Sequence, residues 1–264
     1  MNKVIVISGA SSGIGKLTAE YFHNKGNKVI GLSRSFPKGK YNYSYVLGDL
    51  GNQESIEKAV KEIQKLTDHI DVLVNCAGIG ISGAVEYTTL KEVNEIFQVN
   101  VIGQYYITKL LIPLLRKSSK GKIINIGSVA GELTIPFQTF YSMSKASMHK
   151  FSEGLKMELK PLGIDVCSVL PGDTKTGFTD NRYQPKIKED GLYKDRIKRS
   201  IKKMEHDERN GMSPMSVVKV INKVINRKRM PIQVTVGFSY KFLVLLGKLL
   251  PKRLVNWIIS KMYA

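Results

Sequence analysis

The feature that most constrains the fold is a regular alternation of short apolar runs with segments of helical pattern. The runs are rich in β-branched residues and occur at 4–8, 28–33, 43–50, 70–75, 122–128, 164–172 and 231–237. The segments between them carry apolar residues at helical spacing, as Ile56, Val60 and Ile63 do. Continuously apolar strands are typical of sheets that helices cover on both faces. We therefore predict an α/β protein with a doubly wound, mostly parallel sheet of about seven strands.

Two further helical segments are predicted. A long one is expected from about Leu90 to Lys117, with Pro113 as the place for a kink. A second, amphipathic one is expected within the charged segment 173–212. Its apolar face should hold Leu192, Ile197, Ile201 and Met204.

Composition narrows the class of protein. The chain has 264 residues and 42% hydrophobic residues, which suits one large domain. Cys76 and Cys167 lie far apart in apolar runs, so no disulfide framework is implied and a cytoplasmic location is expected. The net charge of +19 favours anionic partners such as phosphorylated cofactors or acidic lipids, although alternating Lys and Glu, as in SIEKAVKEIQKL, equally fits solvated helix faces.

A glycine-rich stretch, SGASSGIG, joins the first apolar run to the first helical segment. Glycines at these points allow a tight turn and a close approach to a pyrophosphate, and the helix N-terminus offers free N–H groups. The spacing G-x-x-x-G-x-G differs from the commoner G-x-G-x-x-G, so a tight turn without a ligand is the alternative. The residues expected to hold a dinucleotide are Gly9, Ser11, Ser12, Gly13, Ile14 and Gly15.

The second apolar run ends in GLSRS, at the point where dinucleotide-binding folds meet the adenosine ribose. An acidic residue there would accept a hydrogen bond from the 2′-hydroxyl and select NAD(H). This chain has Ser33 followed by Arg34, and arginine pairs well with a 2′-phosphate. The sequence therefore favours NADP(H) over NAD(H), with a solvated surface arginine as the alternative.

These motifs, with others that follow in order, resemble the short-chain dehydrogenase/reductase family. The other matches are Asp49-Leu50, Asn75-Cys76-Ala77-Gly78, Asn100 in QVNVIG, Ser128 in NIGSVAG, Tyr141 and Lys145 in YSMSK, and Pro171-Gly172 with Thr176. The match extends from about residue 3 to residue 177, with Cys76 and Ser8 where the family has asparagine and threonine. The resemblance implies a Rossmann-type fold and an enzyme that interconverts a carbonyl and a secondary alcohol.

The pattern Tyr-x-x-x-Lys alone would not identify an active site, because it occurs four times. Only Tyr141 has a serine thirteen residues upstream at the end of one apolar run and Pro-Gly at the end of the next. The other three pairs, read as structural or surface residues, are Tyr21/Lys25, Tyr87/Lys91 and Tyr105/Lys109.

By this resemblance, the catalytic set is Ser128, Tyr141, Lys145 and Asn100. Tyr141 would be the proton donor, and the Lys145 ammonium one helical turn away would lower its pKa toward the working pH. Ser128 would hold the substrate oxygen, and Asn100 would hold a water linking Lys145 to solvent. Beyond the glycine loop, the cofactor would be held by Ser33, Arg34, Asp49, Leu50, Asn75, Ala77, Gly78, Tyr141, Lys145, Pro171, Gly172, Thr174 and Thr176.

No metal site is expected, because the four histidines lack ligand spacing. We expect all four, His23, His69, His149 and His206, at the surface. Nucleic-acid binding is disfavoured as well, since only the net charge suggests it.

The chain is expected to divide at residue 237. Residues 1–237 would form the dinucleotide-binding domain, with residues 173–212 covering the substrate, and 238–264 an amphipathic extension that Pro251 splits into two helices. Its apolar and basic composition suits a membrane interface, and it resembles extensions of family members acting on steroids, retinoids or sphingoid bases. Docking onto the dinucleotide-binding domain itself, or packing within a homodimer or homotetramer, is the alternative.

The predicted function is an NADP(H)-dependent oxidoreductase for a lipophilic carbonyl or alcohol, such as a hydroxysteroid, bile acid, retinoid or lipid. A non-catalytic NADP-binding sensor or scaffold is the alternative, and the intact Ser-Tyr-Lys set argues against it.

Overall fold

The computed structural model describes residues 2–184 and 191–263. Part of the expected substrate cover, residues 185–190, and the last residue of the extension therefore lie outside the described residues. Among the described residues, no helix combines the length and apolarity that a crossing of the bilayer requires.

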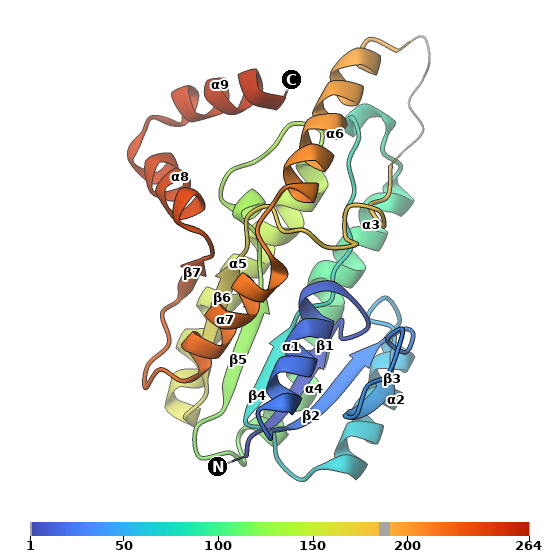
Figure 1. Ribbon diagram of the computed structural model, residues 1–264, viewed down its shortest axis with the longest axis vertical. Helices are drawn as coiled ribbons and strands as arrows, with labels where there is room; N and C mark the ends of the chain where they lie inside the picture. Colours follow the sequence, from blue (N-terminus) through green and yellow to red (C-terminus); the bar gives the residue numbers. More distant parts are fainter. Residues whose placement is uncertain (1, 185–190, 264) are drawn as a thin grey trace.

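A parallel sheet of seven strands forms the centre of the molecule (Figure 1). The strands are β1 (Val4–Ser8), β2 (Lys28–Ser33), β3 (Ser44–Leu47), β4 (Val72–Asn75), β5 (Lys122–Ile126), β6 (Asp165–Leu170) and β7 (Gln233–Thr235). Their order is β3-β2-β1-β4-β5-β6-β7, which confirms the predicted doubly wound sheet. The winding reverses between β1 and β4, and ligands of such sheets bind beyond the carboxyl ends of the strands at this reversal.

Helices cover both faces of the sheet, as the continuously apolar strands predicted. One face packs against α1 (Gly13–Asn24) and α7 (Pro214–Ile225). The other packs against α2 (Gln53–Leu66), α4 (Gly103–Leu115) and α5 (Thr139–Leu159). Successive side chains of β1 point to opposite faces of the sheet, so that Ile5 lies in one core and Val6 in the other.

The long helical segment is interrupted earlier than the sequence suggested. α3 (Leu90–Phe97) passes through a π-helical turn (Gln98–Ile102) into α4, and Pro113 lies inside α4 without breaking it. A Cβ on Gly103 would lie 2.1 Å from the Leu50 carbonyl oxygen, so α4 begins in close contact with the loop after β3. The turn buries Asn100, in keeping with the frequent use of π-helical turns at functional sites.

The remaining helices lie at the carboxyl end of the sheet. They are α6 (Lys194–Arg209), α8 (Phe238–Leu249) and α9 (Lys252–Tyr263), and short 3-10 turns occur at Val85–Tyr87, Val129–Gly131 and Lys160–Leu162. In Figure 1, α8 and α9 stand beside the sheet, with α9 reaching toward α6. Tyr263 of α9 joins the buried cluster that contains Ile197 and Met204 of α6.

The prediction of the apolar face of α6 was wrong for one residue. Ile197, Ile201 and Met204 are buried, but Leu192 is 96% exposed. It precedes the first residue of α6, so it does not share the helical spacing of the other three.

Candidate active site

A cavity of about 1220 Å³ lies beyond the carboxyl ends of the central strands. The turn from β1 to α1, the loops after β2, β4, β5 and β6, and the inner side of α8 and α9 all contribute to its wall. Every residue that the sequence predicted to touch cofactor or substrate lines this cavity, except Asn75 and Asn100. The tertiary fold thus brings together residues spread over most of the chain.

The glycine-rich turn is shaped to receive a phosphate group. Gly9 has φ +72° and Gly13 has φ +53°, both in the left-handed region that favours glycine. A Cβ on Gly15 would lie 2.2 Å from the Gly9 carbonyl oxygen, so the turn closes on itself only without a side chain there. Ser12 precedes α1 and makes no side-chain cap, which leaves the first N–H groups of the helix to a ligand. These features fit a dinucleotide.

Ser8 fastens this turn to the neighbouring loop. Its hydroxyl accepts hydrogen bonds from the backbone N–H of Cys76, at 3.1 Å, and of Ala77, at 3.3 Å. The serine that stands where the family resemblance expects threonine therefore keeps a structural hydroxyl.

The cavity has a basic rim at the end near β2. Arg34 and Lys38 are exposed lining residues that follow β2, and the Lys16 ammonium, also in the lining, donates to the Lys38 carbonyl at 2.7 Å. The Ser33 hydroxyl bonds to that of Tyr45, so the end of β2 presents no carboxylate.

The predicted catalytic side chains meet in the middle of the cavity. Tyr141 and Lys145 lie one turn apart on α5, and the Lys145 ammonium stands 5.8 Å from the centroid of the Tyr141 ring. Ser128, just after β5, accepts from the Ala130 N–H at 3.1 Å, and its hydroxyl is near enough to Tyr141 to lower the pKa of the phenol. A phenol, a hydroxyl and an ammonium arranged in this way can hold a carbonyl oxygen and exchange a proton with it.

Burial has the largest effect on the ionisation of this pair, so the pKa of Tyr141 is raised and not lowered as the sequence suggested. Desolvation raises the pKa of Tyr141 to about 12, against a smaller lowering by its bond to Ser128. Desolvation also lowers the pKa of Lys145 to about 8. The Lys145 ammonium donates to the Ile126 carbonyl at 3.0 Å, so its hydrogen bond goes to the backbone of β5.

The two predicted residues outside the lining act behind it. The Asn100 amide oxygen accepts from the Ile79 N–H at 2.8 Å, and its nitrogen donates to the Ile79 carbonyl at 2.9 Å and to Ser144 at 3.1 Å. Asn75 donates to Thr108 and Asn125, each at 2.8 Å, between β4 and its neighbours. Asn100 thus holds the loop after β4, and Asn75 ties the end of β4 to α4 and β5.

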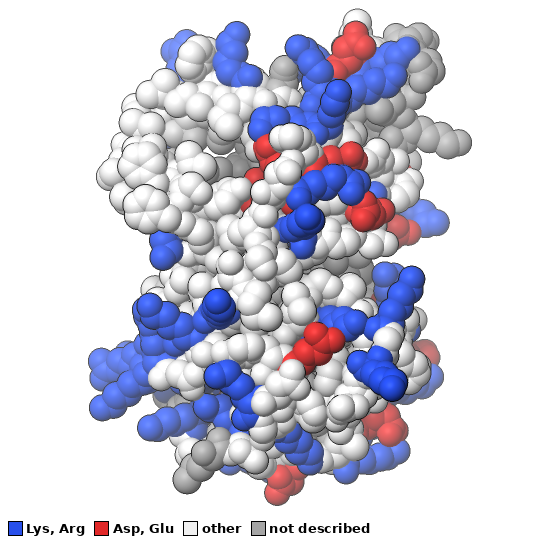
Figure 2. Space-filling view, in the orientation of Figure 1, with Lys and Arg blue, Asp and Glu red and all other residues white. Residues whose placement is uncertain are grey.

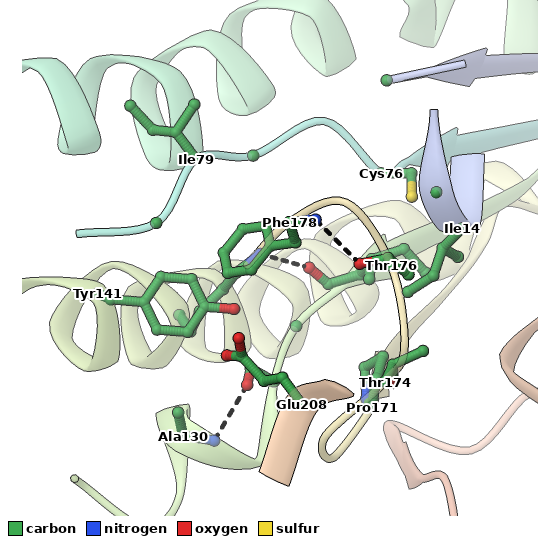
Figure 3. A pocket seen from close by; sticks show the side chains of 18 of the residues that line it. Ile14, Cys76, Ile79, Ala130, Tyr141, Pro171, Thr174, Thr176, Phe178 and Glu208 are labelled. Atoms are coloured by element: carbon green, nitrogen blue, oxygen red, sulfur yellow. Dashed lines mark hydrogen bonds between the residues drawn. The ribbon is translucent and has the colours of Figure 1, made fainter. Parts of the chain in front are cut away.

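The sequence reasoning missed two carboxylates in the cavity, Asp173 and Glu208. Figure 3 shows the Glu208 carboxylate and the Tyr141 hydroxyl pointing toward the same space. Glu208 is held by Thr179 at 2.6 Å and by the buried Arg182. Desolvation raises the pKa of Glu208, and its negative charge in turn raises the pKa of Tyr141. No local sequence motif indicates that Glu208 belongs to the site, because α6 reaches the cavity only in the folded chain.

The sequence did not indicate that the tail forms an apolar wall of the cavity. A membrane, a second subunit or the domain itself was the expected partner of the tail, and one side of α8 and α9 lines the cavity of the domain. Gly247 brings α8 close to Leu133, since a Cβ on it would lie 2.5 Å from that side chain. Phe178 adds a ring whose centroid lies 5.6 Å from that of Tyr141. The amphipathic spacing of the tail was the available signal, although it does not tell which partner a face meets.

One histidine contradicts the expected surface position. His149 is buried under the loop after β5, and its Nδ1 lies 3.1 Å from Glu132. Its Nε2 accepts from the Ser128 N–H at 3.4 Å, so His149 supports the backbone of a predicted catalytic residue. The residues next to His149 in the sequence are mostly polar, so the sequence did not indicate that this position faces the interior.

Comparison with known proteins gives a consistent result. The family model described as short chain dehydrogenase matches residues 3–186. The chain is 39% identical over 264 residues to the 3-ketodihydrosphingosine reductase of Bacteroides thetaiotaomicron, a match that covers 99% of this chain and 98% of the relative. It is 34% identical over 192 residues to the probable short-chain type dehydrogenase/reductase VdlC of Helicobacter pylori, which covers 71% of each.

A solved structure agrees over nearly the whole chain. The short-chain dehydrogenase from Streptomyces avermitilis superposes with a TM-score of 0.82 and 26% identity, covering 98% of this chain and 95% of that one. The chain therefore belongs to the short-chain dehydrogenase/reductase family, and it is an NAD(P)-dependent oxidoreductase that acts on CH–OH and C=O groups.

Proposed function

We propose that the protein uses NADPH to reduce the ketone of a long-chain lipid, or catalyses the reverse oxidation. The observation that carries the proposal is the continuity of one cavity from Tyr141 to the apolar side of α8 and α9. A ketone held at the tyrosine could lay an alkyl chain along that wall. The likeness to a relative named 3-ketodihydrosphingosine reductase supports the same substrate class.

The proposed chemistry assigns one task to each polar group. A bound nicotinamide dinucleotide would supply the hydride. Ser128 would donate a hydrogen bond to the carbonyl oxygen, and Tyr141 would deliver the proton that completes the alcohol. Lys145 would hold the cofactor ribose and return the lost proton to the tyrosine, while Asn100 would hold the loop that faces them.

The glycine turn and the wall around it would hold the cofactor. Gly9, Gly13 and Gly15 would admit the pyrophosphate, and Asp49 with Leu50 would face the adenine. Pro171, Gly172, Thr174 and Thr176 would hold the nicotinamide amide.

The preference for NADP(H) rests on the basic rim near β2. Arg34, Lys38 and Lys16 lie together there, and Ser33 offers no carboxylate to a ribose hydroxyl. A 2′-phosphate would gain charge-assisted hydrogen bonds from this rim. We expect Arg34→Ala to raise the KM for NADPH about tenfold or more and to change that for NADH little. Equal loss with both cofactors would contradict the preference.

Ketone panels and one variant test the proposed function. Purified protein should oxidise NADPH with long-chain 3-keto lipids faster than with steroid or short ketones. Tyr141→Phe should lower kcat by a factor of about 10² to 10⁴ while cofactor binding, measured by fluorescence of NADPH, is retained. A wild-type protein that binds NADPH but turns over no ketone or alcohol would favour the alternative, a sensor.

A reducing compartment is part of the proposal. Cys76 and Cys167 are both free in the described structure, and burial raises the pKa of each thiol to about 12. Neither thiol is therefore suited to react, and the cytoplasm is the compartment we propose.

A further inference from the structure

The helices α8 and α9 carry two apolar faces. The inner face lines the cavity with Leu243, Leu246 and Val255 among others. The outer face is exposed to solvent and follows helical spacing on both helices. On α8 it holds Phe238, Phe242, Leu245 and Leu249, and on α9 it holds Leu254 and Trp257. An ordinary surface helix turns polar side chains to water, so the outer face indicates an interaction surface.

The charged residues of the tail itself all have one sign. Residues 238–264 contain no Asp or Glu, and their Lys and Arg residues are all exposed. Figure 2 shows a surface free of charge over α8 and α9, with blue side chains at its edges. The basic residues of the tail are Lys241, Lys248, Lys252, Arg253 and Lys261.

This charge pattern separates two partners. In a symmetric dimer the same surface meets itself, so the tail cations of both copies would approach each other without any tail carboxylate between them. An anionic bilayer offers the opposite charge at the rim and apolar depth at the centre, and each Lys or Arg near such a surface contributes favourably. The pattern therefore fits the lipid surface and opposes the second copy.

We propose that the outer face of α8 and α9 docks on an anionic lipid bilayer. The inner face of the same helices walls the cavity, so docking places the apolar end of the cavity next to the lipid. A long-chain ketone would then pass from the bilayer to Tyr141 between these helices. This last step rests on the proposed function, whereas the docking itself does not.

Vesicle flotation of the full-length protein tests the docking. The probes are vesicles of phosphatidylcholine alone and of phosphatidylcholine mixed with phosphatidylglycerol. Trp257 is the single tryptophan of the chain and is 60% exposed on the outer face, so its emission reports the contact directly. We expect flotation with the anionic vesicles, a blue shift of the emission, and reversal of both by salt.

Two matched variants sharpen the result. Leu249→Glu alters an outer-face residue that is 72% exposed and outside the cavity lining, so folding and NADPH binding should be preserved. It should weaken binding to anionic vesicles at least about tenfold. The control is Met157→Glu on α5, equally exposed at 68% but outside the tail, which should bind like the wild type.

The outcomes are distinct. Binding only to anionic vesicles, lost in Leu249→Glu and kept in Met157→Glu, supports the docking. No flotation of a folded protein, or equal binding by Leu249→Glu, overturns it. A dimer in sedimentation velocity that Leu249→Glu dissociates overturns it in favour of a second copy. The proposed function is tested separately by turnover of a ketone dispersed in micelles. Absence of turnover would contradict the proposed function whatever the result of the flotation experiment.

Discussion

At the scale of single residues, burial decides how the predicted catalytic groups ionise. Tyr141 and Lys145 stand one helical turn apart, as the sequence indicated, but desolvation favours the neutral form of both. The negative charge of Glu208 adds to this effect on the tyrosine. Spacing along a helix therefore predicted which residues meet, while the enclosing wall, assembled from distant segments, set their protonation.

Glu208→Gln tests this electrostatic account. Removing the carboxylate charge should lower the pKa of Tyr141, because Glu208 opposes the phenolate. In the proposed mechanism alcohol oxidation requires deprotonated Tyr141, so the rate of oxidation should begin to rise at a lower pH in the variant. The pH dependence of kcat/KM measures this. Glu205→Gln, on the same helix but bonded to Gln184 near the surface, is the control, and identical profiles for all three proteins would refute the account.

At the scale of elements, two contacts fix the segments that carry the site. The β1–α1 turn depends on the absence of a side chain at Gly15, and the loop after β5 depends on the buried contact between His149 and Glu132. The sequence pointed to the turn because glycine spacing is a local property. The sequence did not indicate a role for His149, since its partner Glu132 belongs to a different segment and comes close only through the fold of the intervening loop.

Gly15→Ala should disable the turn. The added methyl group would clash with the Gly9 carbonyl oxygen. The backbone at residue 9 or residue 15 would have to move, and either movement would open the loop. We expect loss of NADPH binding and a decrease of about 2 kcal/mol or more in the free energy of unfolding. Gly154→Ala on α5, with no atom near its Cβ, should be neutral or stabilising by up to about 1 kcal/mol. Normal cofactor binding by Gly15→Ala would contradict the prediction.

Glu132→Gln should change the acid stability. The hydrogen bond from His149 holds the pKa of Glu132 at about 2, below its usual value. A depressed folded-state pKa adds stability above the unfolded-state pKa, and this stability is lost as the pH falls toward 2. The variant should lose on the order of 2 kcal/mol at neutral pH and show a flatter decline below about pH 5 in urea titrations. Parallel decline of both proteins would argue against this role.

At the scale of the whole molecule, the cavity is the product of segments far apart in the chain. The β1–α1 turn supplies one end, α5 the centre, and α8 with α9 the apolar wall. A substrate with an alkyl chain would contact all of this wall only in the complete fold.

A series of 3-keto lipids of increasing chain length tests this arrangement. Each methylene buried against the wall should raise kcat/KM by roughly fourfold, from about 0.8 kcal/mol per group, until the cavity is filled. Leu246→Ser, in the lining, should reduce this gain, whereas its neighbour Leu245→Ser, outside the lining, should not. A gain that is independent of chain length, or equal losses in both variants, would remove α8 from the substrate site.

The sequence by itself determined the class of sheet and the position of the glycine turn, and it predicted the catalytic motif, because these depend on local spacing and on short apolar runs. The tertiary structure alone decided the break before α4, the burial of His149, the arrival of Glu208 beside Tyr141 and the use of the tail's inner face. Each of these depends on which distant segment covers a given side chain, and no local pattern in a sequence encodes that neighbour.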